Sequence, residues 1–460
     1  MRPCSPGATL RQLGKLPSWC KEEKTVDINA IATFLLNNLF NQVALLVGIF
    51  VAIGLLAQGK GARLTIEGTV RAALGYVILG VGIDVFIGGL IAFQNVVGAA
   101  FGITPPTSTN TLSGFLQTSG SAVALIMAGG YLVHLILGRI LRTKFVYLTG
   151  HLMYWISVVI AVSVYQSVPG ANAVQVALFG SVIAGIYWTV QPAIMQRFMK
   201  KITGNNDVGF AHTSSLACYL ASIFGKYVGD PKKENAESMK LPGWLGIFKD
   251  INVSTSLVIS LILLASAAAV VIGPADDAVV TGAAGALAWP VWAVVTGLKF
   301  AAGIAVLLYG VRLFLAEVVP AFKGISDRVL PGAKPALDVP VVFSYAPTAV
   351  MIGFLSSTVV FLAFMLGFGA AGVAAIIPPM IMLFFPGGGA GVFGNAVGGW
   401  KGAVLGGAIN GAILAVGQAL FYPALSGTAP EIATLADPDW YLISAIVMPI
   451  ADLLKSFFGG

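Results

Sequence analysis

The sequence predicts an all-α polytopic membrane protein with about eleven transmembrane helices plus re-entrant segments. Apolar residues of the set AVILMFWYC make up 57% of the 460 residues, whereas charged residues make up 10%. Roughly a dozen stretches are apolar and long enough to cross about 30 Å of hydrocarbon, and lysines and arginines gather in alternate connections between them. A water-soluble protein of this length could not bury so much apolar surface.

Each predicted span must satisfy its backbone hydrogen bonds internally, which a single segment in lipid can do only as a helix. In chain order, the predicted spans are residues 31–56, 70–93, 112–137, 147–165, 174–195, 251–272, 287–314, 341–366, 371–385, 403–422 and 440–454.

The orientation follows from the positive charges of the short connections. Lysines and arginines follow the first, third, fifth, seventh, ninth and last predicted spans, whereas connections 94–111 and 167–173 are uncharged and 428–439 is acidic. This pattern predicts a multi-pass membrane protein with the N-terminus outside and the C-terminus cytoplasmic. Residues 1–27 carry no apolar region of a signal peptide. We expect them to form a disordered extension before a permease domain at 28–460.

Residues 204–250 do not fit a simple loop. Their first half, 209–229, is too polar for a full crossing and too apolar for a free connection, which predicts a re-entrant or cavity-lining segment. Glycines cluster at 387–394 and 398–402, where they allow close helix packing and broken helices. A short echo between residues 139–151 and 328–338 is compatible with an internal repeat or with chance.

Polar residues at span entries are the candidates for a binding site, because ionisable groups are costly in a bilayer. His151, His212 and Asp338 all lie at predicted cytoplasm-facing entries and could converge. Each histidine could equally be a satisfied core residue. Asp84 and His134 are weaker candidates. The sequence has no phosphate-binding loop, nucleophile elbow or His/Cys metal spacing, so it predicts no catalytic residue, cofactor, metal or nucleic-acid partner.

Several sequence blocks resemble one family. They are LTGH at 148–151, KLPGWLGIFKD at 240–250, VST at 253–255, AE at 316–317, AFKGIS at 321–326, LPGA at 330–333, FSYAP at 343–347, GVFGN at 391–395 and GGW at 398–400. With these blocks, the chain resembles the ascorbate-specific membrane component (IIC) of the bacterial sugar phosphotransferase system, from about residue 67 to residue 400.

The resemblance implies an eleven-span homodimer in the bacterial inner (plasma) membrane, in which each protomer has a core (transport) domain and a dimerisation domain. It implies that the chain carries L-ascorbate or a related small sugar acid inward. A cytoplasmic IIB partner, charged through IIA, would then phosphorylate it, so whether the chain itself counts as an enzyme stays open. The substrate contacts that the resemblance implies are His151, His212, Thr213, Asp338, Ser344, Tyr345, Gly82, Asn110, Thr111 and Trp155.

The chain departs from the ascorbate pattern at two places. Trp155 stands where the ascorbate carriers have a glutamine, and Thr213, Ser214 and Ser215 stand where they have glutamines after the histidine. These changes leave the substrate open. The alternative function is an ion- or proton-coupled secondary transporter of a small polar solute, with Asp338, Asp84 and His151 as its relay.

Overall fold

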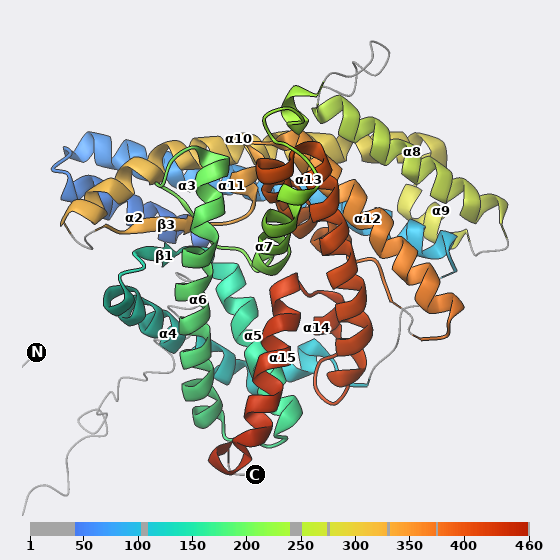
Figure 1. Cartoon of the computed structure of the whole chain (residues 1–460). Helices are drawn as coiled ribbons and strands as arrows, with labels where there is room; N and C mark the ends of the chain where they lie inside the picture. The colour runs from blue at the N-terminus through green and yellow to red at the C-terminus, as the bar shows by residue number, and fades with distance from the viewer. Residues whose placement is uncertain are drawn as a thin grey trace, which may run out of the picture. The chain divides into compact units, whose positions relative to one another are not determined.

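The computed structural model describes residues 42–102, 109–239, 251–273, 277–328, 332–373 and 376–458. The predicted extension at 1–27 lies outside these residues. Figure 1 shows the helices and strands along the chain. They are α2 (Val43–Ala57), α3 (Ala62–Ala100), α4 (Leu112–Leu141), β1 (Phe145–Tyr147), α5 (Gly150–Ser167), α6 (Ala173–Thr203), β2 (Gly209–Phe210), α7 (Ser215–Phe224), η4 (Gly225–Tyr227), η5 (Ala236–Ser238), α8 (Ile251–Ile272), α9 (Ala278–Ala284), α10 (Trp289–Arg328), β3 (Lys334–Leu337), α11 (Pro340–Phe343), α12 (Pro347–Ala370), α13 (Met380–Ala424), α14 (Glu431–Thr434), α15 (Pro438–Leu453) and η7 (Lys455–Phe458).

The predicted class, a helical membrane protein, is confirmed. Among the described residues, seven helical stretches are long and apolar enough to cross a membrane. They are Ala62–Gly82, Leu112–Leu141, Ala173–Thr203, Thr255–Ile272, Trp289–Val318, Pro347–Ala370 and Met380–Ala424. The shorter α2 covers the end of the first predicted span, whose beginning lies outside the described residues.

The prediction of one helix over residues 371–385 is wrong. The preceding helix, α12, ends at Ala370, and the next, α13, begins at Met380. Gly372 takes a left-handed conformation with φ of 65°, and Pro378 and Pro379 follow. A proline removes a backbone donor and clashes with the preceding turn, so a helix cannot run through this pair without breaking.

Helix α13 is a hairpin of two helices that reverses at Gly399, where φ is 62° and ψ is −157°. The two halves touch through glycine. A Cβ atom added at Gly394 would come 2.0 Å from the Gly402 carbonyl oxygen, and one at Gly406 would come 2.2 Å from that of Ala390. Side chains of ordinary size would therefore force the halves apart. The clustered glycines serve close helix packing, as small residues do in membrane proteins.

A small parallel sheet joins three distant segments in the order β1-β3-β2. Phe145 pairs with Lys334 and Tyr147 with Ala336, while Gly209 also pairs with Ala336 on the other side. The two segments that echo each other in sequence therefore lie side by side as strands β1 and β3. The sheet is absent from the sequence-based prediction, because strands of two to four residues carry no periodic pattern.

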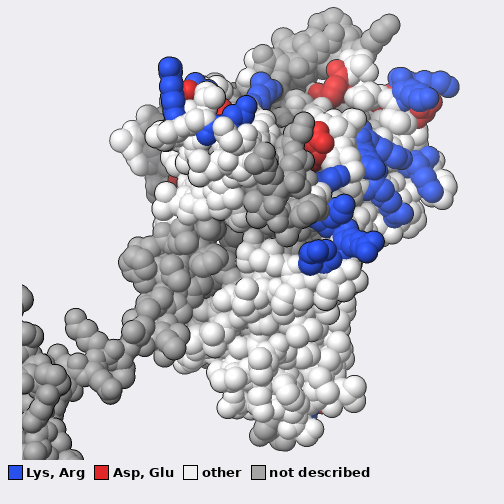
Figure 2. Space-filling view, turned by 90° about the vertical axis from the view of Figure 1, so that its left-hand side faces the viewer, with Lys and Arg blue, Asp and Glu red and all other residues white. Residues whose placement is uncertain are grey.

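Three connections and the C-terminal segment meet at one end of α5 and α6. The Asn110 side chain donates to the Ser426 carbonyl, and Thr428 donates to the Gln166 side chain. The Asn172 amide donates to the carbonyl of Phe458, the last described residue. In Figure 1 the C-terminus lies at the lower end of α6, and the lower part of the face in Figure 2 is almost free of charged side chains.

The predictions for residues 167–173 and for the C-terminus cannot both hold. The sequence pattern places 167–173 outside and the C-terminus inside, yet Asn172 and Phe458 are hydrogen-bonded. Helices α5 and α15 also run parallel, because Ser163 donates to Ser444 and Ser167 donates to the Met448 carbonyl. Residues 425–458 therefore begin and end at the same end of α5. The last predicted span, residues 440–454, does not act as a final crossing.

Candidate functional site

The carboxyl ends of the three parallel strands carry the three polar residues expected at the site. His151 follows β1, His212 follows β2 and Asp338 follows β3. The carboxyl ends of parallel strands meet at one edge of a sheet, which is where open parallel sheets place ligands. The His151 Nε2 lies 3.5 Å from Asp338 Oδ2, and the His212 Nε2 lies 3.7 Å from Asp338 Oδ1. The structure therefore brings these three predicted residues together.

Backbone hydrogen bonds fix this edge of the sheet. The Leu148 amide donates to the Ala336 carbonyl, and the Ala211 amide donates to the Leu337 carbonyl at 2.7 Å. The Thr149 hydroxyl donates across to the Ala211 carbonyl at 2.7 Å. The ladder thus continues beyond the strands to the residues that precede His151 and His212. It fixes the backbone positions from which the two side chains project.

The ring of His212 is held in one orientation. Its Nδ1 accepts from the Ser214 amide at 3.1 Å, so the proton of a neutral ring lies on Nε2. This Nε2 faces two carboxylates, those of Asp338 at 3.7 Å and Asp437 at 4.0 Å. His212 is 5% exposed, whereas the side chain of His151 is 47% exposed. His212 is thus a fixed donor, and His151 is the accessible member of the pair.

Asp437 and Asp439 belong with His151, His212 and Asp338 to one group of side chains, which we call the His and Asp cluster. The sequence analysis treated both aspartates as acids of an outer connection. Thr213 donates to Asp437 Oδ2. Asp439 accepts from the Leu216 amide at 2.7 Å, from Ser215 and, at 2.6 Å, from the Tyr187 hydroxyl. A buried carboxylate is tolerated when several donors satisfy it, and one at a helix N-terminus also meets the positive end of the helix dipole.

A sequence signal for these two acids did exist. Asp437 and Asp439 flank Pro438, and an acid with a proline at the first helical position marks a helix start. The start of α15 could have been predicted from this pattern. Its contact with α7, which begins at Ser215, could not, because 223 residues separate Leu216 from Asp439 in the chain.

Trp155 and Thr213, two of the residues that depart from the ascorbate pattern, both contact α15. The Trp155 ring stacks on Trp440 with centroids 5.5 Å apart and planes inclined by 28°. Thr213 uses its hydroxyl on Asp437. Trp155 lies one helical turn after His151 on α5. Both residues therefore line the wall of the cluster, and each already has a protein partner.

Ser344 and Tyr345 follow the short helix α11. The Ser344 hydroxyl donates to the Val341 carbonyl at 2.9 Å, and Tyr345 is 41% exposed. A cavity lies beside the cluster, and α2, α3 and α10 contribute to its wall. Its lining residues are Val47, Tyr76, Leu79, Leu148, Thr149, Phe314, Leu337, Asp338, Pro340 and Val341. Asp338 is the carboxylate of this lining.

Asn110 and Thr111 are not brought to the His and Asp cluster, whereas Gly82 follows Leu79 of the cavity lining by three residues on α3. Gly82 packs on α10, where an added Cβ would come 2.4 Å from the Leu307 amide nitrogen. Thr111 caps α4 by accepting from the Gly114 amide, and Asn110 binds the Ser426 carbonyl. These two residues precede α4, whereas β1 follows the other end of that 30-residue helix. At a rise of 1.5 Å per residue, these ends are about 45 Å apart.

Two comparisons with known proteins agree with this architecture. The family described as "PTS system sugar-specific permease component" matches residues 38–439. A relative from Mycoplasma pneumoniae (strain ATCC 29342 / M129), named "Ascorbate-specific PTS system EIIC component", is 29% identical over 425 residues. The alignment covers 80% of this chain, and the chain spans 63% of the length of that relative. The match to the family covers most of the chain, so the protein belongs to the sugar-specific permease components of the phosphotransferase system.

Proposed function

We propose that this permease component binds L-ascorbate or a related small sugar acid between His151, His212 and Asp338 and carries it inward. The observation behind the proposal is the meeting of these three side chains at the carboxyl edge of one sheet. Ascorbate is an anion near neutral pH with an enediol edge. The Nε2–H of His212 and the exposed ring of His151 would donate to that edge, and Asp338 would accept from a hydroxyl.

The coupling is part of the proposal. A IIB partner, charged through IIA, phosphorylates the solute after it crosses, and the chain works as a homodimer in the inner membrane. The name of the Mycoplasma relative supports ascorbate. Trp155 and Thr213 support a related acid to the same degree. They stand where the ascorbate pattern has glutamines, and their hydrogen-bonding groups differ from those of glutamine.

The test is uptake of labelled ascorbate in cells that supply matched IIA and IIB, followed by analysis of the product. We expect uptake to depend on both partners, to deliver phosphorylated ascorbate and to survive a protonophore. Asp338→Asn and His151→Ala should reduce it at least tenfold. Asp452→Asn is the control, because its 53% exposed carboxylate pairs with Lys455 far along α15.

Two results would contradict the proposal. Uptake that continues without IIA and IIB and collapses with the protonophore would indicate an ion-coupled transporter. Unchanged uptake in both site variants, at normal protein levels, would place the substrate elsewhere.

A further inference from the structure

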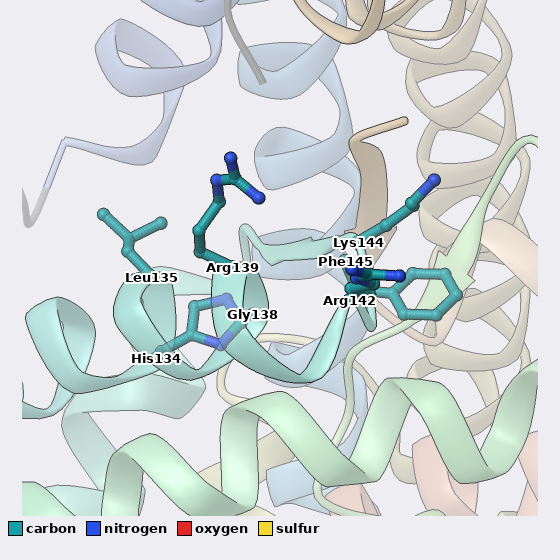
Figure 3. A pocket seen from close by; sticks show the side chains of 7 residues that line it. All are labelled: His134, Leu135, Gly138, Arg139, Arg142, Lys144 and Phe145. Atoms are coloured by element: carbon teal, nitrogen blue, oxygen red, sulfur yellow. The ribbon is translucent and has the colours of Figure 1, made fainter. Parts of the chain in front are cut away.

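A second polar site lies at the end of α4, apart from the His and Asp cluster. Figure 3 shows a pocket lined by the last turns of this helix and the loop to β1. Its lining residues are His134, Leu135, Gly138, Arg139, Arg142, Lys144 and Phe145. Three of these seven residues are basic. Among the described residues, no ion pair within 4.0 Å neutralises Arg139, Arg142 or Lys144.

The loop holds two basic residues in an uncommon backbone conformation. Arg142 has φ of 55° and Lys144 has φ of 62°, in the left-handed region that glycine or asparagine occupies most easily. The β1–β3 pairing supports this conformation, since the Lys334 amide donates to the Lys144 carbonyl at 2.7 Å. Strained residues that a surrounding structure maintains are concentrated at binding sites.

Further lysines add to the positive charge around this loop. Burial lowers the pKa of Lys334, and the charges of Lys200 and Lys144 lower it further, while Asp207 acts in the opposite direction. The Lys144 side chain lies over Gly332, where an added Cβ would come 2.6 Å from its Nζ. Like charges at close range repel, so an anion bound among them would be favoured.

His134 is not a ligand of this pocket. Its Nε2 accepts from the Tyr147 amide at 3.2 Å, and its Nδ1 lies 2.9 Å from the Thr189 hydroxyl. Both ring nitrogens are therefore used in joining α4, β1 and α6. His134, one of the two weaker candidates of the sequence analysis, is thus a fully buried structural residue.

The surface beside the pocket is apolar. Ile136, Ile140 and Leu141 on the last turns of α4 are 58%, 67% and 55% exposed, and Leu135 in the lining is 38% exposed. A basic rim next to exposed aliphatic side chains matches a molecule with a phosphate head and hydrocarbon tails. Basic pockets near the cytoplasmic ends of transmembrane helices bind the headgroups of anionic lipids.

We infer that Arg139, Arg142 and Lys144 form a binding site for the phosphate headgroup of an acidic phospholipid, whose acyl chains lie along Ile136, Ile140 and Leu141. The site is independent of the transported solute. It differs from general attraction of basic loops to the membrane, because it requires the pocket as well as the charges.

The test measures binding of dioleoylphosphatidylglycerol and dioleoylphosphatidylcholine to the delipidated full chain by native mass spectrometry. We expect the wild-type protein to bind phosphatidylglycerol at least tenfold more tightly. Arg139→Gln, Arg142→Asn and Lys144→Asn together should abolish this preference. Asparagine is used at 142 and 144 because it tolerates the left-handed conformation.

Two further variants separate the pocket from its charge. Gly138→Leu keeps all three cations and fills the pocket, since an added Cβ at Gly138 meets only the Thr143 hydroxyl, at 3.9 Å. It should also abolish the preference. The matched control removes three basic residues elsewhere, by Lys226→Gln, Lys232→Gln and Lys233→Gln, and should bind both lipids as the wild type does.

Three outcomes would overturn the inference. The first is equal binding of the two lipids by the wild type. The second is an unchanged preference in the triple variant or in Gly138→Leu. The third is displacement of phosphatidylglycerol by millimolar inorganic phosphate or glycerol 3-phosphate, which would indicate a site for a soluble phosphate.

Discussion

Trp155 stacks on Trp440 with ring centroids 5.5 Å apart, and this contact joins the second turn of α5 to the first turn of α15, two helices that both begin at the His and Asp cluster. Helices α5 and α15 then run parallel from this point, linked by Ser163 to Ser444 and by Ser167 to Met448. The stacked pair therefore fixes the relative position of two helix starts that carry His151 and Asp439.

The first prediction concerns this stack. Trp155→Ala and Trp440→Ala should each destabilise the protein, and a double-mutant cycle should give a coupling energy of about 0.5–1.5 kcal/mol. Unfolding in detergent is the measurement. Trp155→Ala combined with Trp400→Ala is the control, and those effects should add. A coupling near zero for Trp155 and Trp440 would mean that the stack does not stabilise the two helix starts.

The second prediction concerns substrate specificity. Trp155→Gln with Thr213→Gln restores the amides of the ascorbate pattern, so the double variant should bind ascorbate about tenfold more tightly, equivalent to about 1.4 kcal/mol. Calorimetry on folded protein measures it, and Trp155→Phe, which adds no amide, should show no gain. If the double variant folds normally and its affinity stays flat or falls, these positions do not determine specificity.

The third prediction concerns Asp439, which accepts hydrogen bonds from Tyr187, Ser215 and Leu216. Asp439→Ala leaves these donors without an acceptor and should destabilise the protein by about 3 kcal/mol, whereas Asp439→Asn keeps one acceptor and should cost about half as much. Chemical unfolding provides the measurement. Asp452→Ala, at an exposed position on the same helix, should change stability by less than about 0.5 kcal/mol.

The fourth prediction concerns topology. Single cysteines at Ser426 and Ser456 should react alike with an impermeant thiol reagent in intact cells, because Asn110 and Asn172 join both segments to the same end of the helices. A cysteine at Ser238 should show the opposite accessibility. Cys4 and Cys20 are replaced by serine beforehand, and the buried Cys218 is kept. Protection of both Ser456→Cys and Ser238→Cys, with labelling of Ser426→Cys, would restore the placement that the charge pattern predicts.

The fifth prediction is a pH dependence at Glu234. Its hydrogen bond and ion pair with Lys401, at 2.6 Å, lower the pKa of this carboxyl from 4.5. A lowered pKa means that the pair stabilises the fold above the unfolded-state pKa and that this stabilisation is lost as the pH falls through the folded-state value. Wild-type protein should exceed Glu234→Gln in stability at pH 7, and the difference should vanish on acidification toward pH 3. A difference that stays constant with pH would rule out this contribution.

Much of the class and part of the site could be predicted from composition and local pattern. Long apolar stretches predicted the helices, because a spanning segment must satisfy its own backbone in lipid. His151, His212 and Asp338 stood out because polar groups at span entries are costly and so attract attention in a sequence. The glycine clusters also predicted the close packing that Gly394 and Gly402 make within α13.

The errors arose where contacts between distant segments decide the structure. Glu317, for example, pairs at 3.7 Å with Arg71, which lies far away in the sequence. A further error had a local cause: residues 371–385 were predicted as one apolar span, although Pro378 and Pro379 break the helix.

The sequence by itself determined that the chain is a helical membrane protein with polar residues at its helix entries, because hydrophobicity and charge are local properties. Only the tertiary structure decided that Asp437 lies beside His212 and that Asp439 binds Ser215. It also decided that α13 reverses at Gly399 and that the Asn172 amide donates to the Phe458 carbonyl near the C-terminus. Each of these depends on a hydrogen bond, close contact or backbone turn whose partners are chosen by packing in three dimensions, and spacing along the chain does not encode that choice.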